Sequence, residues 1–119
     1  MNTLFTVFLI ASGMMISSFA YSASDHVDGL VISKIRAVGD YASGTIYDHT
    51  IELWFTTSLV WSNTACTDTS RIYIDAKNQH IISAAYIAFS SGKKVGINAD
   101  DTLPIRGGSC EISYLDVEA

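Results

Sequence analysis

The stretch AKNQHIISAAYIAFSS, residues 76–91, decides the fold because its apolar residues recur with the period of a helix. On a helical wheel they form one continuous arc, made of Ile81, Ile82, Ala84, Ala85, Ala88 and Phe89. Asp75 can cap the start of such a helix, and Gly92 can end it in a left-handed turn. We therefore predict a single helix over these residues.

Segments typical of strands lie on both sides of this helix. Residues 30–38, 45–57 and 71–75 precede it, and strands around Val95 and over residues 110–117 follow it. The order β-β-β-α-β-β is that of the five-stranded Greek-key barrel called the OB-fold. We predict a mainly β fold with one helix, arranged as such a barrel.

The first residues of the chain have the pattern of an export signal. The segment 4–16 is almost wholly apolar, long enough for a signal-peptide core and too short for a membrane span. Small residues at Ala20 and Ser22 suit cleavage before Ala23, and cleavage after Ala20 is the alternative. We predict a signal peptide over 1–22, a single domain over 23–119, and a secreted or periplasmic location with no membrane span.

The charged residues all lie after that signal. The formal net charge is −5, so a polyanion would be repelled, and nucleic acid is excluded as a partner. The only cysteines, Cys66 and Cys110, stand just before the third strand and at the start of the fifth, which are parallel neighbours in the predicted barrel. Export favours a disulfide between them, and a reactive or metal-binding thiol is the alternative.

No catalytic or metal-binding motif stands out. The histidines His26, His49 and His80 fall on different predicted elements without metal-ligand spacing. No nucleophile motif and no phosphate-binding glycine loop is present. We predict a protein that is not an enzyme and uses no metal or cofactor.

Two apolar residues fall on otherwise polar faces. Ile87 lies on the polar side of the helix, and Trp54 shares a strand face with Glu52 and Thr56. Such residues are common on surfaces, but they also suit an oligomer contact at Ile87 and a sugar-stacking platform at Trp54. Further candidates for sugar stacking are Trp61, Tyr47 and Tyr41.

Two stretches carry a resemblance to a known family. The segment 31–35, VISKI, and the segment 84–97, AAYIAFSSGKKVGI, resemble the receptor-binding B subunits of pentameric bacterial toxins such as subtilase cytotoxin and typhoid toxin. In that family five OB-fold subunits form a ring, the helices line its pore, and sugars bind the exposed barrel surface. The resemblance implies a homopentamer that binds a cell-surface glycan and accompanies a separate catalytic A subunit.

The same resemblance places candidate ligand-binding residues ahead of the first strand. Members that bind sialic acid use a tyrosine and a serine there, and His26 and Asp28 match those positions by spacing. A carboxylate at Asp28 would repel a sialate, so we expect neutral or weakly charged glycans. The alternative functions are a monomeric periplasmic OB-fold module that binds or inhibits another protein and a small secreted hydrolase.

Overall fold

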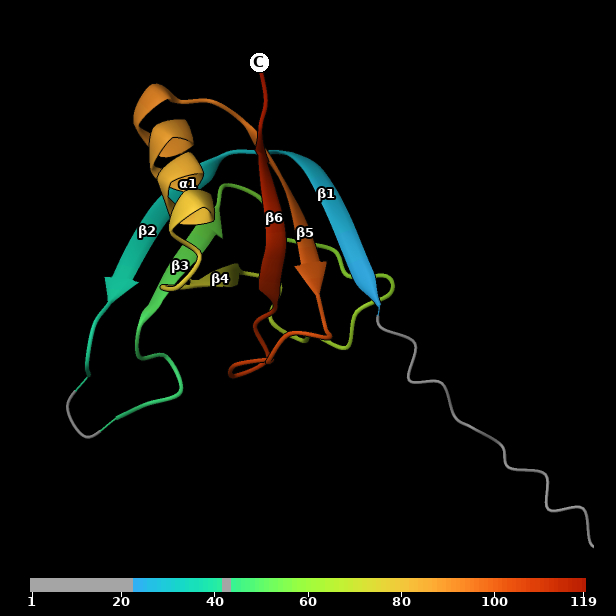
Figure 1. Cartoon of the computed structure of the whole chain (residues 1–119). Helices are drawn as coiled ribbons and strands as arrows, with labels where there is room; N and C mark the ends of the chain where they lie inside the picture. Colours follow the sequence, from blue (N-terminus) through green and yellow to red (C-terminus); the bar gives the residue numbers. More distant parts are fainter. Residues whose placement is uncertain (1–22, 42–43) are drawn as a thin grey trace, which may run out of the picture.

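The computed structural model describes residues 23–41 and 44–119, and the predicted signal peptide of residues 1–22 lies outside them (Figure 1). The described chain is mainly β with one helix, as predicted. Its elements in chain order are β1 (Ser24–Leu30), β2 (Ile32–Val38), β3 (Thr50–Phe55), β4 (Arg71–Asp75), α1 (Gln79–Ser91), β5 (Val95–Asp100) and β6 (Glu111–Val117).

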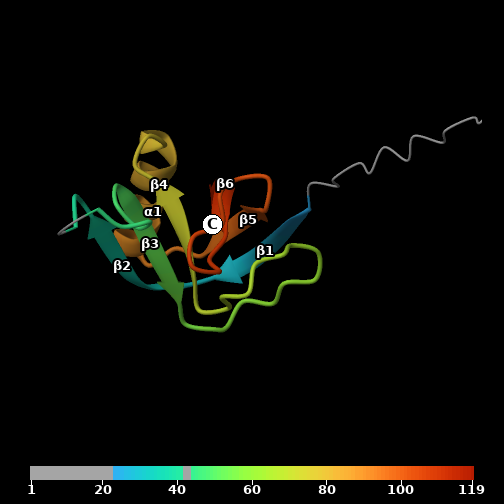
Figure 2. The same ribbon diagram turned by 90° about the horizontal axis from the view of Figure 1, so that it is seen from below.

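The strands form one six-stranded sheet in the order β1-β5-β6-β4-β3-β2, whereas five strands were predicted. The additional strand is β1, which pairs antiparallel with β5. Its residues include three charged or titratable side chains and Gly29, so no apolar alternation marks it in the sequence. Figure 2 shows β1 and β2 on opposite sides, with the chain passing directly from one to the other.

The predicted parallel pairing of the strand before the helix with the last strand is confirmed. β4 and β6 run parallel, with Tyr73 opposite Glu111. Cys66 and Cys110 form a disulfide with their Cα atoms 5.6 Å apart, and they are separated by 44 residues in sequence. The disulfide therefore ties the loop before β4 to the start of β6.

One hydrophobic core lies against all six strands and the helix. Its strand residues include Leu30, Ile32, Leu53, Ile72, Ile97 and Ile112. From α1 it receives Ile81, Ile82, Ala85 and Ala88. The small helix residues Ala85 and Ala88 let the helix backbone approach β6 closely (Figure 1).

The helix begins later than predicted. Asn78 precedes its first turn, and Asp75 instead accepts a hydrogen bond from the Lys77 backbone N–H. The C-terminal prediction is confirmed, because Gly92 has φ 67° and its N–H donates to the carbonyl of Ala88. Phe89 was assigned to the buried arc, but it lies at the edge of that arc and is 45% exposed.

The second predicted strand is also shorter at its start. Residues 45–49 form a turn before β3, because the Asp48 carboxylate accepts hydrogen bonds from the backbone N–H groups of Tyr41 and Thr45. Such a side-chain acceptor competes with strand pairing. Within the described ranges no helix has both the length and the apolar character needed to cross a membrane.

Candidate functional site

Polar and aromatic side chains gather on the outer face of β2, β3 and β4. The strand register places Arg36 opposite Glu52 and Lys34 opposite Trp54. On the other side of β3, Trp54 lies opposite Arg71. Residues far apart in sequence therefore form two adjacent rows, Lys34–Trp54–Arg71 and Arg36–Glu52–Tyr73.

Glu52 is the centre of this face. Its side chain is only 4% exposed, although it is charged. Its Oε1 accepts a hydrogen bond of 2.8 Å from Nη1 of Arg71, and its Oε2 lies 3.6 Å from Nη1 of Arg36. A carboxylate removed from water needs such compensation, so these two guanidinium groups hold Glu52 in place.

Arg71 is fully engaged within the protein. Its Nε donates to Oδ2 of Asp68 at 3.0 Å and to the hydroxyl of Ser109 at 3.2 Å, while Nη2 approaches the Tyr47 hydroxyl at 3.5 Å. Burial lowers the pKa of Arg71, but the nearby Glu52 and Asp68 carboxylates outweigh it and raise that pKa. Arg71 is therefore a structural cation.

Asp68 completes this network from the loop before β4. Desolvation raises the pKa of its carboxyl, but hydrogen bonds from the hydroxyl and backbone N–H of Ser70, from Ser109 and from Arg71 lower it to about 2. Asp68 is therefore ionised at neutral pH. Because Ser109 precedes Cys110, the disulfide lies beside this network.

A hollow of about 560 Å³ opens above Glu52, and we call it the Arg36 pocket. It is lined by Arg36, Val38, Tyr41, Thr45, Tyr47, Glu52 and Arg71. Tyr41 is 65% exposed, so its ring is available to a ligand. Aromatic rings beside hydrogen-bonding charged groups are what a sugar site needs.

The ring of Tyr47 owes its position to a glycine in a distant loop. Gly107 has φ 55°, and a Cβ atom there would collide with the Tyr47 hydroxyl. The ring also lies beside the Arg71 guanidinium, whose Cζ is 5.1 Å from the ring centroid. Gly107 therefore allows Tyr47 to form one wall of the Arg36 pocket.

Trp54 lies next to the pocket and contacts two cations, of which only Arg36 lines the pocket. The Nζ atom of Lys34 is 4.1 Å from the indole centroid, and Cζ of Arg36 is 5.1 Å from it. A smaller hollow of about 300 Å³ lies beside Trp54 and Lys34. The predicted stacking platform is thus half-buried and partly covered by a lysine ammonium.

The second predicted tryptophan has a different environment. Trp61 is partly buried and packs against the hydrophobic core. Its Nε1 donates a hydrogen bond of 2.8 Å to the backbone carbonyl of Asp68. These contacts fix the loop that carries Asp68, and they account for Trp61 without a ligand.

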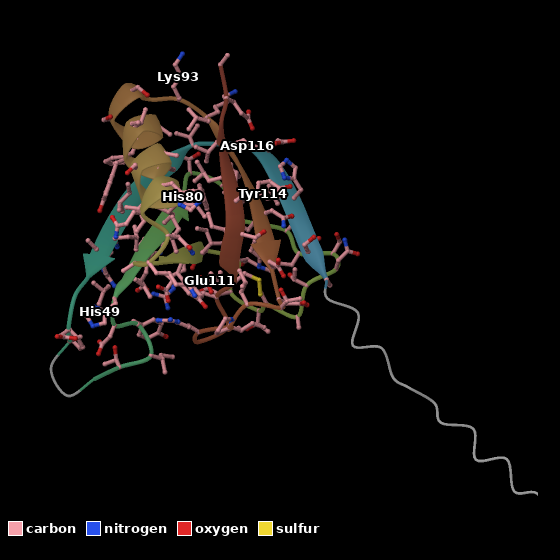
Figure 3. The ribbon with its side chains drawn as sticks, in the orientation of Figure 1. His49, His80, Lys93, Glu111, Tyr114 and Asp116 are labelled. Carbon is pink, nitrogen blue, oxygen red and sulfur yellow. A yellow bond between two sulfur atoms is a disulfide. The ribbon has the colours of Figure 1, made fainter. Side chains whose placement is uncertain are left out.

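His26 and Asp28 lie in a separate group that we call the His26 cluster, together with Tyr114 and Asp116. Nε2 of His26 is 2.7 Å from Oδ1 of Asp28, and Nδ1 is 3.0 Å from the Tyr114 hydroxyl. Figure 3 shows Tyr114 and Asp116 along β6, on the side facing β1. The cluster thus joins β1 to β6 across β5.

Among the described residues, the His26 cluster is the group whose geometry most resembles a metal site. Donor atoms of His26, Asp28 and Asp116 lie within 4.8 Å of one another. All three residues are exposed, and the unpartnered buried polar atom among the described residues, Oγ1 of Thr64, belongs to none of them. Exposed carboxylates of this kind are common without an ion, so we assign none.

A third polar group surrounds the buried Glu111, which follows Cys110 in the chain and is labelled in Figure 3. Burial, and then the nearby Asp75 carboxylate, raise the pKa of Glu111. Burial and the Glu111 charge raise the pKa of Tyr73 to about 12, and the Tyr73 hydroxyl donates to the Pro104 carbonyl. Tyr73 is therefore a neutral donor that fixes the loop before β6.

The structure does not bring the predicted ligand-binding residues together. His26 and Asp28 lie on β1 at one end of the strand order, whereas Trp54 lies on β3 near the other end. The predicted interface residue Ile87 is 61% exposed on α1, beside the exposed Tyr86. Two polar surfaces and one apolar helix face are thus separate features.

Sequence reasoning missed Arg36, Glu52 and Arg71 as parts of one site. The polar face with Glu52 was visible in the alternation of the second strand, but its partners lie 16 and 19 residues away. Only the cross-strand register identifies them. Tyr41 and Tyr47 were candidates, and the structure places both at the same pocket.

Searches against protein families, curated proteins and solved structures found no match.

Proposed function

We propose that the chain is a secreted, non-catalytic glycan-binding subunit of a toxin-like homopentamer. The observation that carries this proposal is the Arg36 pocket, in which the Tyr41 and Tyr47 side chains stand beside charged hydrogen-bonding groups. Sugars are bound by this combination, because aromatic faces pack on C–H groups while polar groups bond the hydroxyls.

The proposed fold beneath this site is an OB-fold barrel. Only Val31 separates β1 from β2, although these strands stand at the two ends of the sheet order. Gly29 has φ 68°, and the pairing register shifts on both sides of this point. A bulged, bent first strand that pairs at both ends would close the sheet into five strands.

The proposed ring uses the outer side of α1. Tyr86 and Ile87 are exposed there, and Phe89 flanks them. Burying these side chains against a second copy would remove apolar surface from water. In this arrangement a separate catalytic A subunit would be carried by the ring, as the toxin resemblance implies.

A glycan array tests the proposal when it is probed with mature protein of known particle mass. The variant Tyr41→Ala should lose at least about fivefold in signal, because Tyr41 is exposed and its side chain makes no hydrogen bond among the described residues. Tyr114→Ala is the matched control, since it removes an exposed tyrosine from the His26 cluster.

Four results would contradict parts of the proposal. Loss of binding in Tyr114→Ala alone would move the glycan site to the His26 cluster. A monomeric wild-type particle at micromolar concentration, or an Ile87→Asp variant of unchanged mass, would contradict the ring. An array without signal from an oligomer would favour the protein-binding alternative.

A further inference from the structure

Arg36 differs from its neighbour Arg71 in having donors free for a ligand. Its side chain is 53% exposed, and its nearest carboxylate oxygen, Oε2 of Glu52, lies at 3.6 Å. No hydrogen bond joins its guanidinium to another group in the described ranges, whereas three side chains accept or approach the donors of Arg71 at 3.2 Å or less. The Arg36 guanidinium is held in place by Glu52 and Trp54 but is not saturated.

Among the residues that line the pocket, the cations outnumber the carboxylates, because Arg36 and Arg71 face a single carboxylate, Glu52. Lys34, Arg36 and Arg71 provide three cations, and the carboxylates paired with them are Glu52 and Asp68. This excess occurs on a chain whose net charge is −5. Lys34 also lies over Trp54 with no hydrogen-bond acceptor among the described residues.

Two further acidic groups lie in the adjacent loop, and both are already engaged. The Asp48 carboxylate accepts hydrogen bonds from the backbone N–H groups of Tyr41 and Thr45. Asp40 pairs with His49 at 2.7 Å, at the loop labelled His49 in Figure 3. These contacts turn the loop carboxylates toward their own backbone and partner.

We propose that the Arg36 pocket binds a sugar that carries an anionic group, a carboxylate or a sulfate. The anion binds the free donors of Arg36 near the Lys34 ammonium, and the sugar ring lies against Tyr41 and Tyr47. Two anionic oxygens match the paired N–H groups of a guanidinium. This inference rests on the proposed glycan-binding function and names the ligand class of that site.

The inference reverses the expectation of neutral glycans. That expectation relied on Asp28 and on the net charge, but Asp28 lies on β1 within the His26 cluster, away from β2 and β3. At short range the charges lining the site act more strongly than the net charge, because salt screens distant charges over about 8 Å in physiological buffer.

Titration of the mature protein with three related sugars tests the inference by two-dimensional NMR. The probes are D-glucuronate, D-glucose 6-sulfate and D-glucose, which differ at one carbon and distinguish a carboxylate from a sulfate. The signals to follow are the Arg36 Nε–H and the Trp54 indole N–H. We expect one or both anionic sugars to bind at least about tenfold more tightly than glucose, and added salt to reduce that preference.

A matched pair of variants assigns the preference to the pocket. Arg36→Gln should abolish it, whereas Lys93→Gln removes the same charge from the turn after α1 and should retain it. Both variants should fold, because Arg71 still pairs with Glu52 at 2.8 Å in Arg36→Gln and Lys93 is exposed.

The outcomes separate failure of the inference from failure of the proposed function. Equal binding of all three sugars at the pocket, or equal effects of the two variants, would overturn the anionic ligand and leave glycan binding intact. If no sugar shifts the pocket signals and the glycan array is also silent, both are overturned. Array binding without any pocket shift would overturn the inference and place the glycan site elsewhere.

Discussion

The Arg36 pocket and the His26 cluster are both built from polar side chains on strand faces, yet they differ in burial. In the pocket, Glu52 is almost completely buried between two arginines. In the cluster, Asp28 and His26 form a shorter contact of 2.7 Å, but both remain exposed to water. Distance alone therefore does not indicate which group is important for stability.

The difference follows from the dielectric environment of each pair. Water screens the exposed pair, so its contribution to the free energy of unfolding is small. Loss of one partner from the buried group leaves an uncompensated charge in a poorly solvated place, which is costly. The pocket should behave as a rigid, preorganised surface and the cluster as a solvated one.

Removal of the disulfide should have the largest effect. The double variant Cys66→Ser/Cys110→Ser should lose about 3 to 4 kcal/mol of unfolding free energy, because it opens a closed loop in the unfolded chain. Urea unfolding measures the loss, and hydrogen exchange should show weaker protection near Asp68 and Arg71 than in β1. Equal loosening of both regions would show that the disulfide supports the whole sheet rather than the pocket.

The comparison is tested directly by neutralising one carboxylate in each region. Glu52→Gln should lower the unfolding free energy by about 3 kcal/mol, because Arg71 and Arg36 lose their buried counter-charge. Asp28→Asn makes the same charge change in the exposed cluster and should cost less than about 1 kcal/mol. Urea unfolding curves with similar midpoints for the two variants would contradict the assignment.

A smaller effect on the free energy of unfolding should come from replacing Asp25, which lies on β1 beside the cluster but is buried. Its carboxylate accepts hydrogen bonds from the backbone N–H groups of Asn63 and Thr64 and from the Ser62 hydroxyl. Desolvation raises the pKa of Asp25, but these hydrogen bonds outweigh it and lower the pKa to about 2 from 3.8.

Because the folded-state pKa is the lower one, the stabilisation by Asp25 is present above pH 4 and is lost as the pH falls toward 2. Its size is about 2 kcal/mol. The difference in unfolding free energy between wild type and Asp25→Asn should therefore shrink over that range, while Asp68 titrates in both proteins. A difference that stays constant from pH 6 to pH 2 would contradict the role of Asp25.

The fold was predictable where the side chains repeat with a clear period. The apolar arc of α1, the left-handed Gly92 and the alternation of Ile51, Leu53 and Phe55 all correspond to observed elements. β1 was missed because Asp25, His26 and Asp28 hide its pattern. Its pairing with β5 is a long-range contact that local propensity does not encode.

The sequence by itself determined a mainly β chain with one helix, because side-chain periodicity is a local property, and it favoured a disulfide that the structure contains. Only the tertiary structure decided which polar residues meet. The register of three strands brings Arg36, Glu52 and Arg71 together, and the strand order separates Trp54 from Asp28. The physical reason is that side-chain chemistry is written along the chain, whereas distance and burial arise from pairing between segments far apart in it.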